Sequence, residues 1–127
     1  MSSSKVEQRE TVLVIDNDAV FASVLANSLA KRGYRALAAL NMDETLRLLR
    51  NETPAKVVLD LRLGTTSGLQ LLPILTAANP DIRIVVLTGF ANLETAAAAL
   101  RLGASHYLSK PVDADEIVAA FQQPKLH

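Results

Sequence analysis

The sequence predicts an α/β fold built on a doubly wound, five-stranded parallel sheet. Short aliphatic runs alternate with helical patterns along the chain, in the order (βα)5. Strands separated by helices form parallel sheets with right-handed crossovers. The runs are dense in Val, Leu and Ile, which is typical of strands covered by helices on both faces. Among doubly wound orders, 2-1-3-4-5 is the natural choice for five strands.

Five apolar runs are the expected strands. They are residues 11–15, 34–40, 55–61, 82–87 and 104–109. The third run is aliphatic until a single carboxylate, Asp60. A carboxylate is costly to bury inside a strand, but the carboxyl end of a parallel strand is the edge at which open α/β sheets place their sites. We therefore expect the other strand ends to converge on Asp60.

Five helices are expected between and after these strands, and residues 64–68 are expected to be a loop. The helices cover residues 19–32, 42–50, 69–78, 92–102 and 114–121. Residues that cap helices well precede four of them, three with capping-box spacing: Asp18, Asn41 with Glu44, Ser67 with Gln70, and Asp113 with Glu116.

Composition limits the class of protein. A chain of 127 residues is one domain by length, and we place it at residues 11–123, with tails at 1–10 and 124–127. Thirteen basic residues balance thirteen acidic ones, without the basic stripe that a DNA-binding domain shows. Cysteine is absent, which excludes disulfides and thiol catalysis. Neither a membrane-spanning run nor a signal peptide is visible, so a cytoplasmic protein is expected.

Chemically active side chains follow four of the five expected strands. They are Asp16, Asn17 and Asp18, then Asp60, then Thr88 and Gly89, and finally Lys110. Clustered carboxylates favour a hard divalent cation such as Mg²⁺. Phosphoryl transfer mainly needs positioning and charge neutralisation. In this set Asp60 is the nucleophile that forms an aspartyl phosphate, Lys110 and the metal neutralise the phosphoryl group, and Thr88 donates a hydrogen bond to it.

Over residues 11–122 the chain resembles the receiver domain of two-component response regulators. The matching motifs are Leu13-Val14-Ile15-Asp16, Val58-Leu59-Asp60-Leu61 with Gly68, Val86-Leu87-Thr88-Gly89, and Gly103-Ala104 with Tyr107-Leu108-Ser109-Lys110-Pro111. The resemblance implies the CheY-like, flavodoxin-like form of the predicted sheet. Residues 87–90 and 110–116 are similar to the redox-responding RegA/PrrA-type regulators of proteobacteria, in which a Fis-like helix-turn-helix follows the receiver. We therefore expect an excised receiver rather than a single-domain regulator.

The resemblance implies a role for each matching residue. Asp60 accepts a phosphoryl group from a phosphohistidine on a sensor histidine kinase, with Mg²⁺ as cofactor. The implied metal ligands are Asp16, Asn17, Asp60 and the backbone carbonyl of Arg62. Lys110 contacts the phosphoryl group and forms a cis peptide bond with Pro111, while Thr88 and Tyr107 act as the switch.

The implied output is a remodelled surface. The fourth helix, the fifth strand and the fifth helix form the face that controls an output, in the first place transcription, and this face is a possible homodimer interface. DNA would be reached only through an output domain outside this chain, and no membrane is involved. The domain is not expected to act as an enzyme on another molecule, beyond catalysing its own phosphorylation and dephosphorylation.

Two departures from the family pattern carry predictions, and two further positions carry one through the resemblance. Asn17 stands where a second acid is usual, so we expect weaker Mg²⁺ binding and slower phosphorylation because one unit of charge is missing. Gly64 stands where proline is common, which predicts a more mobile loop. Arg62 and Phe90 each lie two residues beyond an active-site residue, and the resemblance implies that these positions tune hydrolysis of the acyl phosphate. Bulky Phe90 then predicts a long-lived phosphorylated form.

Other interpretations remain open at this point. The main alternative is a pseudo-receiver, an interaction module in which Asn17 prevents efficient phosphorylation. An aspartate-nucleophile phosphatase is disfavoured because Arg62 replaces the usual second acid, and a flavodoxin-like carrier is disfavoured because no phosphate-binding loop follows the first strand. His106 and His127 are expected on the surface. Four apolar residues of the last two helices could serve either core or interface: Leu93, Leu100, Val118 and Phe121.

Overall fold

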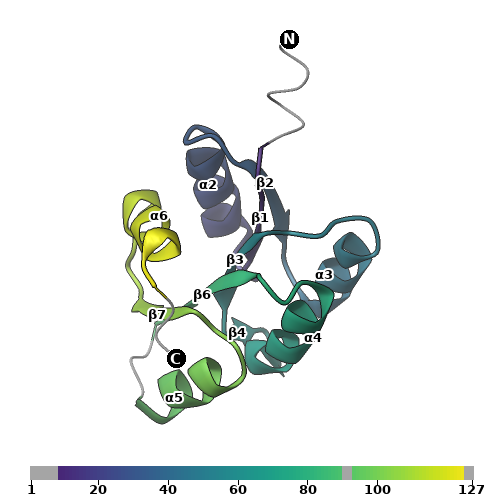
Figure 1. Cartoon of the computed structure of the whole chain (residues 1–127), viewed down its shortest axis with the longest axis vertical. Coiled ribbons are helices and arrows are strands. Elements are labelled where there is room, and N and C mark those ends of the chain that lie inside the picture. The colour runs from purple at the N-terminus through teal and green to yellow at the C-terminus, as the bar shows by residue number, and fades with distance from the viewer. Residues whose placement is uncertain (1–8, 90–92, 125–127) are drawn as a thin grey trace.

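The computed structural model describes residues 9–89 and 93–124, and in it helices cover both faces of a central parallel sheet (Figure 1). The sheet strands are β1 (Thr11–Ile15), β2 (Arg35–Ala39), β3 (Lys56–Asp60), β6 (Arg83–Thr88) and β7 (His106–Ser109). They lie in the order β2-β1-β3-β6-β7, and each neighbouring pair is parallel. Numbered among themselves, the sheet strands have the predicted order 2-1-3-4-5.

The strand labels differ from the predicted numbering because of a small hairpin. Strands β4 (Arg62–Leu63) and β5 (Thr66–Ser67) pair antiparallel to each other in a separate two-stranded sheet. The prediction of a plain loop over residues 64–68 was therefore wrong. Gly64 turns the hairpin with a φ of 65°, a conformation that glycine adopts without steric cost, and buried Leu63 anchors it.

The five α-helices are α2 (Ala19–Ala30), α3 (Met42–Leu49), α4 (Leu71–Ala78), α5 (Leu93–Arg101) and α6 (Ala114–Gln122). The predicted N-caps Asp18, Asn41 and Asp113 are confirmed, because each side chain accepts a hydrogen bond from a backbone N–H in the first turn. The capping box of Asp113 with Glu116 is complete. Glu44 instead accepts from the N–H of Leu40, at 2.8 Å.

The helix expected over residues 69–78 begins differently from the prediction. Residues Gly68–Gln70 form the 3₁₀ turn η1, and Ser67 accepts a hydrogen bond from the N–H of Leu69, at 3.2 Å. Gln70 completes no capping box, so that prediction was wrong. Pro73 has no N–H to bond the carbonyl of Leu69, four residues earlier. The first turn accordingly closes with the tighter bond from Leu71 N–H to the Gly68 carbonyl.

Side chains alternate between the two faces of the sheet and form two core layers. Leu13, Ile15, Leu59 and Val86 belong to the layer under α3, α4 and α5, whereas the layer under α2 and α6 includes residues such as Val12, Val14, Val58, Val85 and Leu87. Figure 1 shows α2 and α6 together on one side of the sheet and α3 and α4 on the other. The two core layers leave the strand ends as the places where polar side chains can gather.

The structure shows which of the ambiguous apolar and histidine residues are buried and which are exposed. Phe121 is buried, and Leu100 and Val118 pack against the core layers, whereas Leu93 is 87% exposed. His106 is only 7% exposed, so its predicted surface position was wrong. It pairs with Val85 at the start of β7, a register that places its side chain on the same face of the sheet as Val85. His127 lies outside the described residues.

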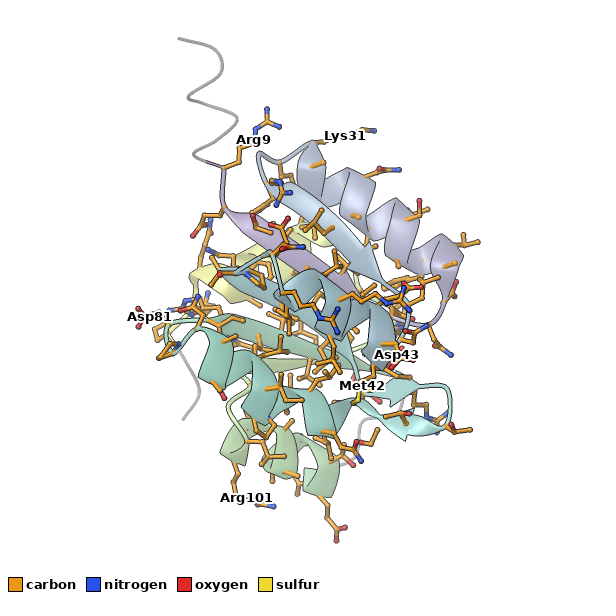
Figure 2. The ribbon with its side chains drawn as sticks, turned by 90° about the vertical axis from the view of Figure 1, so that its right-hand side faces the viewer. Arg9, Lys31, Met42, Asp43, Asp81 and Arg101 are labelled. Carbon is orange, nitrogen blue, oxygen red and sulfur yellow. The ribbon has the colours of Figure 1, made fainter. Side chains whose placement is uncertain are left out.

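The two edges of the sheet can be distinguished in Figure 2. Met42 and Asp43, which follow β2, lie at the opposite side of this view from Asp81, which precedes β6. The first side is the carboxyl edge of the sheet and the second the amino edge. Among the described residues, no helix has the length and hydropathy required to cross a membrane.

Candidate functional site

The register of the sheet brings the predicted site residues to one edge. Asp16 directly follows β1, Asp60 ends β3, Thr88 ends β6 and Lys110 follows β7. Asp60 pairs with Leu87, and Thr88 pairs with Ser109. Because all of these strands are parallel, their carboxyl ends place the four side chains along the same edge.

Lys110 joins the two acids of this edge. Its Nζ lies 2.8 Å from Oδ2 of Asp16 and 3.2 Å from Oδ2 of Asp60. The residues Asp16 and Asp60 are 1% and 7% exposed. Two carboxylates this deeply buried repel each other and lack water, so a cation between them is needed to keep both ionised.

Each carboxylate is also tied to its own loop. Oδ1 of Asp16 accepts a hydrogen bond from the N–H of Asp18, and Oδ1 of Asp60 accepts one from the N–H of Arg62, both at 2.9 Å. In both acids the loop therefore holds one oxygen while Lys110 holds the other. The two side chains have fixed orientations before any ligand is considered.

The charges of the site perturb its ionisation. Burial raises the pKa of Asp16, against the hydrogen bonds from Lys110 and the Asp18 amide, which lower it; the nearby charge of Asp60 raises it further. Burial alone would lower the pKa of Lys110, but hydrogen bonds and charge interactions with Asp16 and Asp60 outweigh it, and the pKa is raised. The lysine therefore stays protonated at neutral pH.

Gly68 packs against the backbone of the candidate nucleophile. A Cβ built on Gly68 would lie 2.6 Å from the carbonyl oxygen of Asp60 and 3.0 Å from Cα of Leu61. The N–H of Gly68 also donates to the carbonyl of Leu61, at 2.8 Å. Only glycine fits this position without moving the Asp60 loop, which gives a physical reason for the spacing between Asp60 and Gly68.

The remaining predicted residues lie around this centre. Thr88 is buried, and its carbonyl accepts a hydrogen bond from the N–H of Lys110, at 2.8 Å. The Lys110–Pro111 peptide bond is cis, as predicted. Tyr107 is half-buried against the core layer under α5. A Cβ added to Gly89 would meet no described residue within 4 Å. Phe90 lies outside the described residues.

The predicted ligand oxygens fit a hard divalent cation. Because Asn17 is an amide, they carry one negative charge fewer than a site with three acids. Carboxylate, amide and carbonyl oxygens are the ligands that Mg²⁺ and Ca²⁺ prefer. Asn17 is exposed beside buried Asp16, and Asp18 caps α2 with a hydrogen bond from the N–H of Phe21. Across residues 9–89 and 93–124, no three His, Cys, Asp or Glu side chains gather in a metal-binding cluster.

Sequence reasoning missed one residue of this site. The Nζ of Lys110 lies 4.4 Å from the ring centroid of Phe21, within range of a cation–π interaction. Phe21 lies in the first turn of α2, so the sequence showed that it is close to Asp16 along the chain. Its ring faces a lysine from the other end of the chain because α2 packs against β1 and α6.

A protein-family model matches most of the chain. Residues 12–122 match the response regulator receiver domain. Among curated proteins, the acid tolerance regulatory protein ActR of Sinorhizobium medicae is 39% identical over 90% of this chain and 59% of its own length. The photosynthetic apparatus regulatory protein RegA of Rhodobacter capsulatus is 40% identical over 87% of this chain and 60% of its own length. The chain thus spans about 60% of the length of these relatives.

Solved structures agree with the fold. A response regulator from Burkholderia pseudomallei, crystallised with a phosphorylated aspartic acid, a calcium ion and citrate, is 45% identical and superposes with a TM-score of 0.86; the match covers 90% of this chain and 67% of that one. A CheY-like receiver domain from Methanospirillum hungatei is 26% identical, with a TM-score of 0.82 over 88% of this chain and 90% of that one.

Proposed function

Because the chain belongs to the response regulator receiver domains, we propose that Asp60 is its phosphoacceptor and that a sensor histidine kinase is the donor. The observation that carries this assignment is the geometry of Lys110, whose Nζ bridges Asp60 and Asp16 at the carboxyl edge of the sheet. The similar Burkholderia pseudomallei protein contains a phosphorylated aspartic acid, which supports the same chemistry here.

The proposed reaction is a direct phosphoryl transfer. A carboxylate oxygen of Asp60 attacks phosphorus, a P–O bond of an acyl phosphate forms, and the P–N bond to the kinase histidine breaks. The imidazole nitrogen leaves with the electron pair of that bond. Lys110 keeps its proton and donates a hydrogen bond to a phosphoryl oxygen, so it neutralises charge that would otherwise repel the carboxylate. Thr88 donates to another oxygen of the group.

A divalent cation, Mg²⁺ in the cell, belongs to this proposal. Asp16, Asp60, the side-chain oxygen of Asn17 and the backbone carbonyl of Arg62 would hold it. When bound, such an ion neutralises negative charge on phosphoryl oxygens. The calcium ion in the Burkholderia pseudomallei structure supports a divalent ion at this kind of site. Because Asn17 carries no charge, we expect a lower affinity than a site with three acids would have.

The proposed consequence of phosphorylation is a change in one face of the domain, which we take to span residues 11–123. New negative charge at Asp60 draws the Thr88 hydroxyl inward, Tyr107 follows, and the face formed by α5, β7 and α6 is remodelled. Leu93 and Leu102, exposed by 87% and 40%, supply apolar surface for a homodimer or an output domain on that face. Transcription would be controlled through an output domain outside residues 1–127. The protein would act in the cytoplasm.

A pseudo-receiver is the second candidate, and the exposed, uncharged Asn17 favours it. In this alternative the domain binds a partner without being phosphorylated efficiently. The interaction face would then be used in a single conformation. The two candidates differ in the response of Asp60 to a small phosphodonor.

The deciding experiment treats the purified chain with acetyl phosphate over a series of Mg²⁺ concentrations and measures intact mass. We expect a gain of one phosphoryl group in the unmodified chain and none in Asp60→Asn. Asn17→Asp should reach the same mass at a lower Mg²⁺ concentration. If the unmodified chain gains no mass while Asn17→Asp does, the pseudo-receiver interpretation is correct. A gain of mass in Asp60→Asn equal to that of the unmodified chain would contradict the assignment of Asp60.

A further inference from the structure

Phe21 is a neighbour of the Lys110 ammonium in addition to the two buried carboxylates. Its ring centroid is 4.4 Å from Nζ of Lys110, while Asp16 and Asp60 accept hydrogen bonds from the same Nζ. A lysine ammonium has three N–H donors, and two of them are used by the carboxylates. The electron-rich ring face is therefore a third neighbour that favours the positive charge.

The position of Phe21 is fixed by a short chain of hydrogen bonds that begins at Asp16. The N–H of Asp18 donates to Oδ1 of Asp16 at 2.9 Å, and the N–H of Phe21 donates to Oδ1 of Asp18 at 3.1 Å. Residues 16–21 thus supply both a carboxylate and an aromatic ring to one lysine. Because both groups come from the same short segment, the Asp18 cap sets their separation.

Lys110 needs such a restraint. Its side chain has four rotatable carbon–carbon bonds and ends in a strongly hydrated ammonium, and 24% of the side chain is exposed. Without the Phe21 ring beside it, the ammonium gains freedom to turn toward water. An amine held in place before the reaction stabilises transferred charge without a reorganisation cost.

We propose that Phe21 is a positioning residue for phosphoryl transfer, which holds the ammonium of Lys110 against Asp60 through the face of its ring. This role rests on the proposed function of Asp60. Phe21 touches neither the phosphoryl group nor the metal ligands in this account, and it acts only through Lys110. A cation–π interaction of ordinary strength corresponds to a change of about 2- to 30-fold in an equilibrium or a rate.

Phe21 also has an ordinary packing role, which the test must separate from the proposed one. It packs against the core layer under α2 and α6, together with Val112. With Val24 and Ala114 it lines a shallow hollow between α2 and the start of α6. Loss of any large apolar side chain here would destabilise the fold without any effect that is specific to Lys110.

The first test is the NMR ring-current shift of the Lys110 ε-methylene protons. In the unmodified chain we expect these protons to be displaced upfield, because they lie near the ring face. Phe21→Tyr should keep the displacement, and Phe21→Leu or Phe21→Met should lose it. Leu25→Val, a packing change one turn along α2, is the matched control and should keep it. An undisplaced signal in the unmodified chain would overturn the proposal, and this measurement requires no phosphorylation.

The second test is the rate of phosphorylation by acetyl phosphate at saturating Mg²⁺. We expect Phe21→Leu to lower the maximal rate about 5-fold with little change in the half-saturating acetyl phosphate concentration. Phe21→Tyr should retain the rate of the unmodified chain. In a Lys110→Met background, Phe21→Leu should lower the rate no further. An unchanged rate, no rescue by tyrosine, or an equal loss in the Lys110→Met background would overturn the proposal. If the unmodified chain gains no phosphoryl group, the proposed function itself fails, and the ring-current shift still decides whether Phe21 holds Lys110.

Discussion

Two lysines occupy chemically similar positions at opposite edges of the sheet, and only one of them lies in the candidate site. Lys110, at the carboxyl edge, contacts two acids and one aromatic ring. Lys56 begins β3 at the amino edge, where it pairs with Glu10 and lies 5.9 Å from the ring centroids of both Tyr34 and Phe121. β3 therefore has Lys56 at one end and Asp60 at the other.

The difference between the two lysines lies in the acids. The Lys56 side chain is the less exposed of the two, at 13% against 24%, but its partner Glu10 is 53% exposed. The side chains of Asp16 and Asp60 are 2% and 9% exposed. An exposed acid is solvated with or without its lysine, whereas a buried acid depends on it. The same combination of groups thus links chain segments at one edge and holds reactive charge at the other.

Substituting each lysine by methionine should reveal the largest difference in stability between the two edges. In Lys110→Met, Asp16 and Asp60 remain buried without their cation, so we expect a loss of about 3 kcal/mol in the free energy of unfolding, together with a large fall in phosphorylation rate. Lys56→Met should cost about 1 kcal/mol or less. Urea denaturation at neutral pH, with a chelator present, measures both losses. Equal losses would show that burial of the acids is not what separates the two edges.

Gly68→Ala should perturb the carboxyl edge without changing its charge. The new methyl would lie 2.6 Å from the Asp60 carbonyl oxygen, so the loop must shift, at a cost of about 1–2 kcal/mol. Gly89→Ala is the matched control, because a Cβ there meets no described residue within 4 Å. Thermal unfolding measures the cost, and acetyl phosphate labelling reports the displacement of Asp60. A Gly68→Ala chain as stable as Gly89→Ala would mean that the loop adapts freely.

Asn17→Asp adds one negative charge at the carboxyl edge, where the metal ion is expected to bind. An added negative charge near a divalent ion should raise Mg²⁺ affinity about tenfold or more, since one pair of unit charges at about 4 Å is worth roughly 1–4 kcal/mol between water and an effective dielectric of 20. Asp18→Asn removes a charge one residue away but keeps the N-cap of α2, and it should change affinity little. Titration calorimetry distinguishes the two variants. Similar affinities for Asn17→Asp and the unmodified chain would contradict the prediction.

A smaller effect is expected from His106 near the amino edge. Burial lowers its pKa below the usual 6.5, the Pro124 carbonyl raises it, and the charge of Arg83 lowers it again. Among the described residues, neither ring nitrogen has a hydrogen-bond partner of ordinary geometry. Between the lowered folded-state pKa and 6.5 the unfolded chain binds more protons, so stability falls as the pH falls through this window.

His106→Leu should remove this pH dependence and stabilise the fold by about 1 kcal/mol. The measurement is the free energy of unfolding of both chains in a series of buffers from neutral to mildly acidic pH. The variant and the unmodified chain should diverge as the pH falls. Parallel curves would show that the proton of His106 is not linked to folding.

The predictable part of the fold came from patterns that are local in sequence. The five sheet strands and five α-helices follow from aliphatic runs and helical spacing, and the caps Asp18, Asn41 and Asp113 follow from side chains that bond their own first turn. The hairpin β4–β5 was missed because it has only two residues in each strand. His106 was misplaced because a polar side chain at a strand start gives no sign of the direction in which it points.

The candidate site was predictable to the same extent. Asp16, Asp60, Thr88 and Lys110 could be placed at one edge because every parallel strand ends there. Their motif spacing could also be matched to a family. The contact of Lys110 with both acids, the close approach of Gly68 to Asp60 and the ring of Phe21 over Lys110 could not be predicted, since each joins segments that are brought together only by packing.

The order of strands and helices and the kind of chemistry at the strand ends can be read from the sequence. Alternating hydrophobicity and side-chain type are properties of each residue and its near neighbours. The folded chain, by contrast, is needed to show which acids are buried, which lysine is held between two carboxylates, and which glycine leaves room for the nucleophile. Burial and charge pairing depend on distances between segments far apart along the chain, and those distances exist only once the helices have packed on the sheet.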